Sequence, residues 1–181
     1  MGYAIVVDTC VARAAGQTDD PVARKCLQAL DAITDSGHSL AMSKPLQDEW
    51  FKSRSEHREP YSQYASMYTL AWFVSMRTKR RVLWIEIEDS AELRNQILEA
   101  SGKQNYDEIQ KDLYLVETAL ASDKRVLSID DRVRKHFCDA GQIVKQLCEI
   151  LWLNPARDAV SNWLWNGAPD KQEYRLCDVI V

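Results

Sequence analysis

The chain has 181 residues, of which 46% are hydrophobic and 28% are charged, and its formal net charge is −4. This length and composition predict one globular domain with a sizeable core, and the net charge excludes an overall basic attraction to nucleic acid. No run approaches ~18 apolar residues and no basic leader precedes an apolar run, so we expect neither a membrane span nor a signal peptide.

The cysteines are odd in number and include no CxxC pair, which argues against both a disulfide framework and a zinc ribbon. A reducing compartment follows, and we expect a cytoplasmic protein. The five positions are Cys10, Cys26, Cys138, Cys148 and Cys177.

Residues 3–7 are an apolar run that predicts a buried first strand, and the run ends at Asp8. Thr9 follows, with a hydroxyl that can reach a water molecule or a metal ion. A parallel strand that closes on an acid is a recurrent way to build a metal site. The alternative is that Asp8 only caps a turn or a helix.

A capped helix over residues 21–35 and a short strand over residues 39–42 come next. Ser43 then predicts the cap of a further helix, which carries Glu49 close to the carboxyl edge of the sheet. Asp48 stands beside Glu49, so the choice between these two acids stays open.

Residues 61–76 are apolar on nearly all sides, which predicts a helix mostly in the core, or else an interface with a second copy. The basic residues 77–81 are typical of a solvated helix end, with RNA backbone contact as the alternative. Residues 82–88 predict a strand or an extended connector. Ser90 predicts the cap of a helix that ends near Gly102.

The clearest helix pattern follows, with Asp107 as its predicted cap and apolar residues at intervals of four, three and four. This stripe comprises Ile109, Leu113, Val116 and Leu120. Asp112 lies beside it. Residues 125–129 then have the composition of a buried parallel strand, and Asp130 follows them. The alternatives are that Asp112 is only an exposed helix residue and that Asp130 or Asp131 only caps the next helix.

A short basic helix comes next, and its Arg132, Arg134 and Lys135 could meet phosphate beside the acids. We expect residues 1–153 to form the main unit. Residues 154–181, which open with a last amphipathic helix, should pack as a helix and tail on the same domain.

Four acids thus fall on the expected carboxyl edge of one parallel sheet, where ligands collect in such folds. They are Asp8, Glu49, Asp112 and Asp130. Like charges ~4 Å apart repel by ~4 kcal/mol at an effective dielectric of 20, so such a cluster needs compensation. A divalent cation would supply it, and ligation by oxygen without Cys or His favours Mg²⁺ or Mn²⁺ over zinc.

These motifs resemble those of the PIN-domain nucleases. The resemblance rests on VVDTC around Asp8, the glutamate of SKPLQDEW, the acid of KDLYLVETALA, and the strand-end SIDD, where Ser128 replaces the family's threonine. It covers about residues 3–137 in motif order and spacing. Cys10 departs from the pattern, because many members have a small polar residue there.

The resemblance implies a three-layer α/β/α sandwich with a central, mostly parallel sheet and a Mg²⁺- or Mn²⁺-dependent ribonuclease centre that leaves 5′-phosphate and 3′-hydroxyl ends. The implied metal ligands are Asp8, Asp112 and Asp130, with Glu49 as a further ligand or as the holder of a metal-bound water. Thr9 and Ser128 would orient these ligands. Asp131 is the alternative to Asp130 as the last ligand.

The resemblance also implies partners. RNA, single-stranded or structured, is the implied substrate. Many small bacterial members are toxins restrained by an antitoxin protein, and many form homodimers, so an antitoxin and a second copy are candidate partners that no residue pattern indicates. We expect no membrane partner.

Other classes fit less well. A phosphatase of the haloacid dehalogenase type needs a second Asp two residues after the first, where this chain has Cys10. A receiver domain needs a later strand-end lysine that we cannot place, and no glycine-rich phosphate loop is present. The remaining alternative is a non-catalytic PIN-like scaffold that binds RNA or protein, and the intact acids argue against it.

Overall fold

The computed structural model describes residues 2–16, 19–51, 65–87, 91–102 and 106–178. Five strands form one sheet in the order β3-β2-β1-β4-β5, and every pair of neighbours is parallel. The strands are β1 (Ala4–Val7), β2 (Ser39–Ser43), β3 (Val82–Ile85), β4 (Arg125–Leu127) and β5 (Leu151–Leu153). The predicted α/β class with a central parallel sheet is therefore confirmed.

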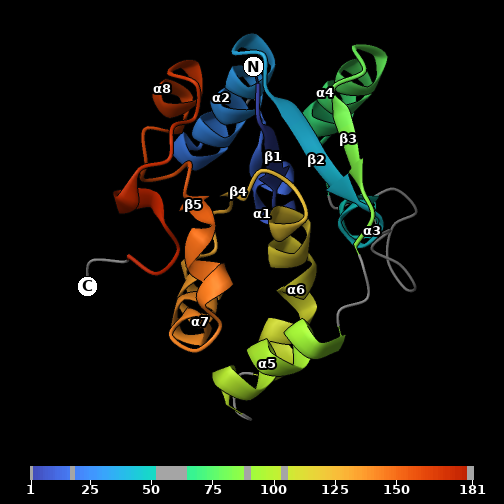
Figure 1. The fold of residues 1–181 in the computed structure, drawn as a ribbon. Helices are drawn as coiled ribbons and strands as arrows, with labels where there is room; N and C mark the ends of the chain where they lie inside the picture. The colour runs from blue at the N-terminus through green and yellow to red at the C-terminus, as the bar shows by residue number, and fades with distance from the viewer. Residues whose placement is uncertain (1, 17–18, 52–64, 88–90, 103–105, 179–181) are drawn as a thin grey trace.

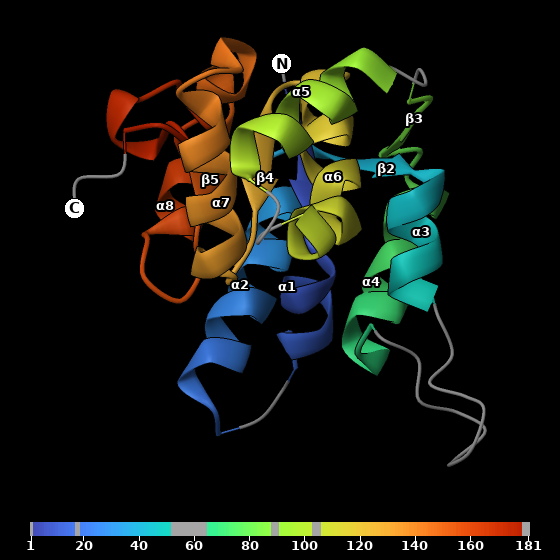
Figure 2. The ribbon, with the colours of Figure 1, turned by 90° about the horizontal axis from the view of Figure 1, so that it is seen from below.

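Helices cover both faces of this sheet. The view from below in Figure 2 shows α1, α2 and α4 on one face and α5, α6 and α7 on the other, which is a three-layer α/β/α arrangement. The helices are α1 (Thr9–Ala14), α2 (Pro21–Asp35), α3 (Lys44–Phe51), α4 (Met67–Thr78), α5 (Ala91–Ser101), α6 (Tyr106–Leu120), α7 (Asp131–Gly141) and α8 (Val160–Trp165). Two 3₁₀ turns, η1 (Lys145–Glu149) and η2 (Gln172–Tyr174), flank β5 and the last segment.

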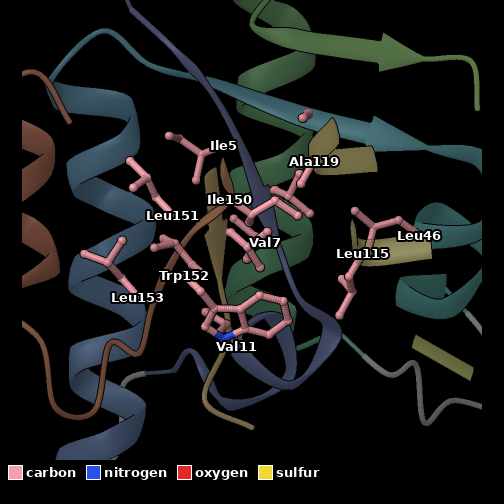
Figure 3. Packing of buried hydrophobic residues seen from close by; sticks show 14 of the residues in the cluster. Ile5, Val7, Val11, Leu46, Leu115, Ala119, Ile150, Leu151, Trp152 and Leu153 are labelled. Atoms are coloured by element: carbon pink, nitrogen blue, oxygen red, sulfur yellow. The ribbon is translucent and has the colours of Figure 1, made fainter. Parts of the chain in front are cut away.

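The core is built around β1, the middle strand. Ile5 and Val7 are fully buried, and Figure 3 shows them between Leu115 and Ala119 of α6 and the side chains of β5. The indole Nε1 of Trp50 on α3 donates to the Val7 carbonyl at 3.1 Å. Continuous apolar composition is expected for a parallel strand covered on both faces. Because the strand is covered on both faces, it can hold the residue after it in a fixed place.

The order of the strands reverses between β1 and β4. From β1 the sheet extends through β2 and β3 on one side, and through β4 and β5 on the other (Figure 1). Such a switch point leaves a crevice at the carboxyl ends of the strands, where ligands bind. Asp8 directly follows β1 and Asp130 lies just beyond β4, so both acids stand at this point.

The predicted starts of three helices differ from the structure. Residues 65 and 66 are not helical, because Ser66 caps α4 by accepting from the Thr69 N–H at 3.1 Å. Asp107 lies inside the first turn of α6 and is not its cap. The last helix begins at Val160, because Asn154 and the residues after it form a turn closed by their own side chains. The predicted cap at Ser90 and the part of the predicted helix at residues 61–64 lie outside the described residues.

The cysteines also depart from the prediction. Cys148 and Cys177 form a disulfide, whereas the odd number of cysteines argued against such bonds. This bond joins η1 to the last segment, and the Leu176 N–H donates to the Ile150 carbonyl at 2.8 Å beside it. The final residues of the described chain are therefore held against β5. Cysteine counting missed the pair because 29 residues separate its members and only the fold brings them together.

Within the described ranges, no helix is both long enough and apolar enough to cross a membrane.

Candidate active site

Asp8 occupies the buried turn between β1 and α1 and is 6% exposed. Its N–H donates to the Leu127 carbonyl at 2.9 Å, which extends the pairing of β1 with β4 by one residue. Its Oδ1 accepts from the Cys10 N–H at 3.3 Å and so caps α1. Burial raises the pKa of the Asp8 carboxyl, hydrogen bonds from Cys10 and Ser128 lower it, and the charge of Asp130 raises it. The capping role considered for Asp8 is present, but it uses only one carboxylate oxygen.

A hydrogen-bond network ties the ends of β1 and β4 together. The buried Ser128 hydroxyl donates to Oδ2 of Asp8 at 2.6 Å and accepts from the Asp130 N–H at 3.1 Å. The Cys10 thiol donates to the same Oδ2 at 3.0 Å and accepts from the Ile129 N–H at 3.3 Å. The two strand-end acids therefore share one support.

Asp130 caps α7 with one oxygen. Its Oδ1 accepts from two backbone N–H groups at the start of the helix, at 3.0 and 3.1 Å. Its Oδ2 accepts no hydrogen bond from any described residue. Asp131 is engaged elsewhere, because its Oδ1 lies 3.0 Å from Nδ2 of Asn154 and 2.9 Å from the guanidinium of Arg157. Of the two neighbouring acids, Asp130 is the one whose charge acts on Asp8 and Asp112.

Asp112 comes from the middle of α6 and is half-buried. Its carboxylate makes no hydrogen bond and no ion pair with any described residue. Its pKa is raised to about 7, first by burial and then by the charges of Asp8, Asp130 and Glu49, in that order. The sequence-derived idea that Asp112 is only an exposed helix residue is therefore wrong, because three acids from three other elements act on this one.

Asp48 and Glu49 are consecutive residues of α3, but their side chains have different surroundings. Glu49 is half-buried and contributes to the field on Asp112. Asp48 is exposed and forms an ion pair with Lys44 one turn earlier. The structure therefore places Glu49, and not its neighbour, with the other acids.

Two residues near the acids had only a weak signal in the sequence, or none. Tyr114 extends from α6, and burial together with the charges of Asp8, Asp112 and Glu49 raises the pKa of its phenol. Its spacing from Asp112 gave no hint, because helix residues two apart do not share a face. The position of Cys10 was a weak signal, because a capping Asp accepts a hydrogen bond from the N–H of the residue two positions later.

Thr9 was expected to orient the ligands. Its Oγ1 is buried and makes no hydrogen bond of ordinary geometry within the described part of the chain, although the hydroxyl is near enough to Tyr114 to lower the pKa of that phenol. A buried hydroxyl without a firm partner is unusual and is free to serve a bound ligand or water.

The basic residues of α7 are placed differently from the prediction. Arg134 is 8% exposed, so it offers far less surface to a phosphate than the prediction assumed. Arg132 and Lys135 are exposed, and Arg132 lies 3.2 Å from Glu108. The pattern missed the burial of Arg134 because Arg157 and Asp158, from a later segment of the chain, lie near it.

The basic cluster at residues 77–81 lies at the other end of the molecule. It joins the end of α4 to β3, at the amino ends of the strands, and Lys79 caps the helix. Arg81 donates from its guanidinium to the carbonyls of Ile33, Thr34 and His38. This arrangement is that of a helix end with one structural arginine, and the cluster does not adjoin the four acids.

The four acids have the right chemistry for a divalent cation, although their side chains are not drawn together around one point. All four acids offer hard oxygen ligands, and Asp112 and Asp130 each hold oxygens with no donor among the described residues. Yet within those residues no group of three or more His, Cys, Asp or Glu side chains is drawn together as an ion-binding set. Side chains of like charge are expected to stay apart when no cation lies between them.

Comparison with protein-family models, with curated protein sequences and with solved structures gave no match. The fold and the four acids define an α/β protein with acidic side chains at a topological switch point.

Proposed function

We propose that the chain is a metal-dependent phosphodiesterase that cuts RNA, with its active site at the four acids. The observation that carries this proposal is the state of Asp112. It is a half-buried carboxylate with no hydrogen-bond donor among the described residues, and its pKa is raised to about 7 by burial and then by the charges of Asp8, Asp130 and Glu49. A carboxylate in this environment must either hold a proton or share a cation. A divalent cation is the partner that would relieve all four charges at once.

Asp8, Asp112 and Asp130 are the proposed ligands, and Glu49 is a fourth ligand or the holder of a water molecule. A bound Mg²⁺ or Mn²⁺ supplies an acidified water and neutralises charge that develops on phosphate. The absence of imidazole from the set, and the engagement of the Cys10 thiol with Asp8 and Ile129, favour these hard ions over zinc.

The remaining residues of the site act by holding the acids. Ser128 fixes Oδ2 of Asp8 and the backbone of Asp130 at the same time. The first N–H groups of α7 donate to Oδ1 of Asp130 and fix the carboxylate. Its Oδ2 accepts no hydrogen bond from the described residues and is available to a metal ion. Such supporting hydrogen bonds set the orientation and basicity of ligands.

RNA is proposed as the substrate because of the resemblance to PIN-domain ribonucleases, and cleavage would leave 5′-phosphate and 3′-hydroxyl ends. A toxin role with an antitoxin partner, and a homodimer, belong to the same proposal. The exposed Arg132 and Lys135 on α7 are the nearby cations that could meet the RNA backbone.

The test is cleavage of end-labelled single-stranded RNA in Mn²⁺, Mg²⁺ or EDTA. We expect cleavage with either ion and none with EDTA. Asp8→Asn and Asp112→Asn should each slow cleavage roughly 100-fold or more, because removal of a ligand forfeits several kcal/mol of charge stabilisation. Asp48→Asn is the matched control, since Asp48 is exposed and paired with Lys44. Equal loss in the control, or cleavage that persists in EDTA, would refute the proposal.

One observation favours a second candidate, a PIN-like scaffold that binds RNA or protein without cutting it. No ready-made group of metal ligands is present among the described residues. A folded protein that binds RNA equally well with and without Mn²⁺, and never cleaves it, would support this scaffold over the nuclease.

A further inference from the structure

A cavity of about 390 Å³ opens between α5, α6 and the start of α3, next to the acids but separate from them. Its volume falls within the roughly 300–1,000 Å³ typical of pockets for small organic groups. Tyr106 and Tyr114 supply aromatic surface, and Asn95 and Gln110 supply amide groups. Leu98 adds apolar lining. None of these residues has a part in holding the four acids.

The charge of this cavity is balanced within its own wall. Arg94 on α5 forms a two-point ion pair with Glu117 on α6, with Nη2 3.2 Å from Oε2 and Nε bonded to Oε1. Glu117 is almost fully buried, so this pairing is needed to keep its carboxylate inside. Arg94 is also the one cation among the described residues that line the cavity. The cavity therefore suits an uncharged planar group better than a phosphate.

The cavity and the acids share their walls. Pro45 lines the cavity and lies one turn before Glu49 on α3. Gln110 and Leu113 line it from α6, on either side of Asp112 in the chain. Tyr114 lines it as well, and the charges of three of the acids reach its phenol. A chain bound at the acids could thus place its next unit in the cavity.

We infer that this cavity accepts one unpaired nucleobase of the RNA, next to the phosphate that lies at the acids. The inference rests on the proposed function and names the part of the substrate that the site reads. Tyr106, which is 40% exposed at the cavity, would stack on the base. The amides of Asn95 and Gln110 each offer both a donor and an acceptor to the edge of the base. The substrate class is then single-stranded RNA with a base preference at one position.

The test measures binding without cleavage. Fluorescence anisotropy of labelled RNA hexamers, with Ca²⁺ in place of Mn²⁺ or Mg²⁺ so that an oxygen-ligated cation is present at the acids, gives the affinity of the wild type, of Tyr106→Ala and of Trp165→Ala. Trp165 is the matched control, because it is an exposed aromatic residue of α8, which packs on α2 and does not line this cavity. Loss of a stacked base should weaken binding about 5-fold or more in Tyr106→Ala, with no change in Trp165→Ala.

A scan of abasic nucleotides makes the test specific. Removal of the one base that enters the cavity should weaken wild-type binding as much as Tyr106→Ala does, and should have no further effect on that variant. Asn95→Ala and Gln110→Ala should reduce the difference in affinity between hexamers of different base composition. Thermal melting of each variant confirms that it is folded.

Two results separate this inference from the proposed nuclease. Equal affinity of the wild type and Tyr106→Ala, or additive losses in the abasic scan at every position, overturns the base site whatever the cleavage assay gives. The same Tyr106-dependent and position-specific binding in Asp8→Asn supports the base site even if the wild type never cuts RNA. In that case only the catalytic proposal fails.

Discussion

The hydroxyl of Ser128 donates a hydrogen bond of 2.6 Å to Oδ2 of Asp8, and it joins residues 120 positions apart in the chain. The same hydroxyl accepts from the Asp130 N–H at 3.1 Å. One small side chain therefore sets the relative positions of the acids that follow β1 and β4. The switch point of the sheet brings these strand ends together, and Ser128 fixes how the two acids are oriented there.

Ser128→Ala should weaken the site without removing a ligand. Loss of its hydroxyl leaves Oδ2 of Asp8 with one hydrogen bond fewer, and supporting residues of this kind typically change metal affinity or activity by about 10- to 100-fold. Calorimetric titration with Mn²⁺ and the RNA cleavage rate would measure both effects. Ser128→Thr keeps the hydroxyl and should recover most of the loss. An alanine variant that binds Mn²⁺ like the wild type would show that the hydroxyl only stabilises the turn.

Asp112 should make the stability of the metal-free protein depend on pH. Its pKa is raised from 3.8 to about 7 in the folded protein, so between these values the native state holds a proton that the unfolded chain has lost. Stability from this group is therefore present below about pH 4 and falls as pH rises towards 7. In EDTA, Asp112→Asn should be more stable than the wild type at pH 8, by roughly 1–3 kcal/mol.

Thermal melting at pH 5 and pH 8 measures this effect. A gain of 1 kcal/mol corresponds to a rise of about 2–4 °C in Tm for a chain of this size. The advantage of the variant should shrink at pH 5, where the wild-type carboxyl is protonated. It should reverse when Mn²⁺ is added at pH 8, because only the wild type then gains a ligand. A variant less stable than the wild type in EDTA at pH 8 would contradict the electrostatic account.

The ion pair between Arg94 and Glu117 should stabilise the contact between α5 and α6. Arg94→Ala would leave the Glu117 carboxylate buried without its cation, at a cost of roughly 1–3 kcal/mol, because the arginine itself is partly exposed. Urea unfolding measures this loss. The double variant Arg94→Leu/Glu117→Leu removes both charges and should recover most of the stability. A single variant as stable as the wild type would mean that the pair contributes nothing to this contact.

The disulfide gives a prediction that needs no activity. Protein isolated and denatured without reductant should show three titratable thiols, and five after reduction. Cys148→Ser should lower the free energy of unfolding by about 2–4 kcal/mol, because the open loop of the unfolded chain is no longer restrained. The control is Cys138→Ser, because Cys138 is half-buried and lies outside the disulfide, whereas Cys26 is buried. Five thiols without reductant would show that the bond is absent.

The sheet and the positions of its acids could be predicted because their signals are local. The apolar run at residues 3–7 and the buried segment at residues 125–129 mark strands covered on both faces, and each is followed by an acid. Parallel strands bring their carboxyl ends to one edge, so Asp8 and Asp130 had to be neighbours if β1 and β4 were paired. The position of Asp112 could be predicted from the apolar stripe of its helix, which lies beside it.

The rest depended on contacts between residues far apart in the chain, which composition does not encode. Asn154 and Arg157 engage Asp131, and this distinguishes it from Asp130. The burial of Arg134 was likewise invisible in a sequence that looks basic and solvated. The pairing of Cys148 with Cys177 requires that the last segment return to β5. In each case a tertiary contact decides the role of the side chain.

The central claim, that the four acids share a divalent cation, is tested most directly by calorimetric titration of the metal-free protein with Mn²⁺. We predict saturable binding by the wild type and by the control Asp48→Asn, and its loss in Asp8→Asn and in Asp112→Asn while both variants stay folded. Binding should also release protons at pH 6, because Asp112 is partly protonated there before the cation enters. No saturable binding to the folded wild type, or equal binding by all four proteins, would contradict the account.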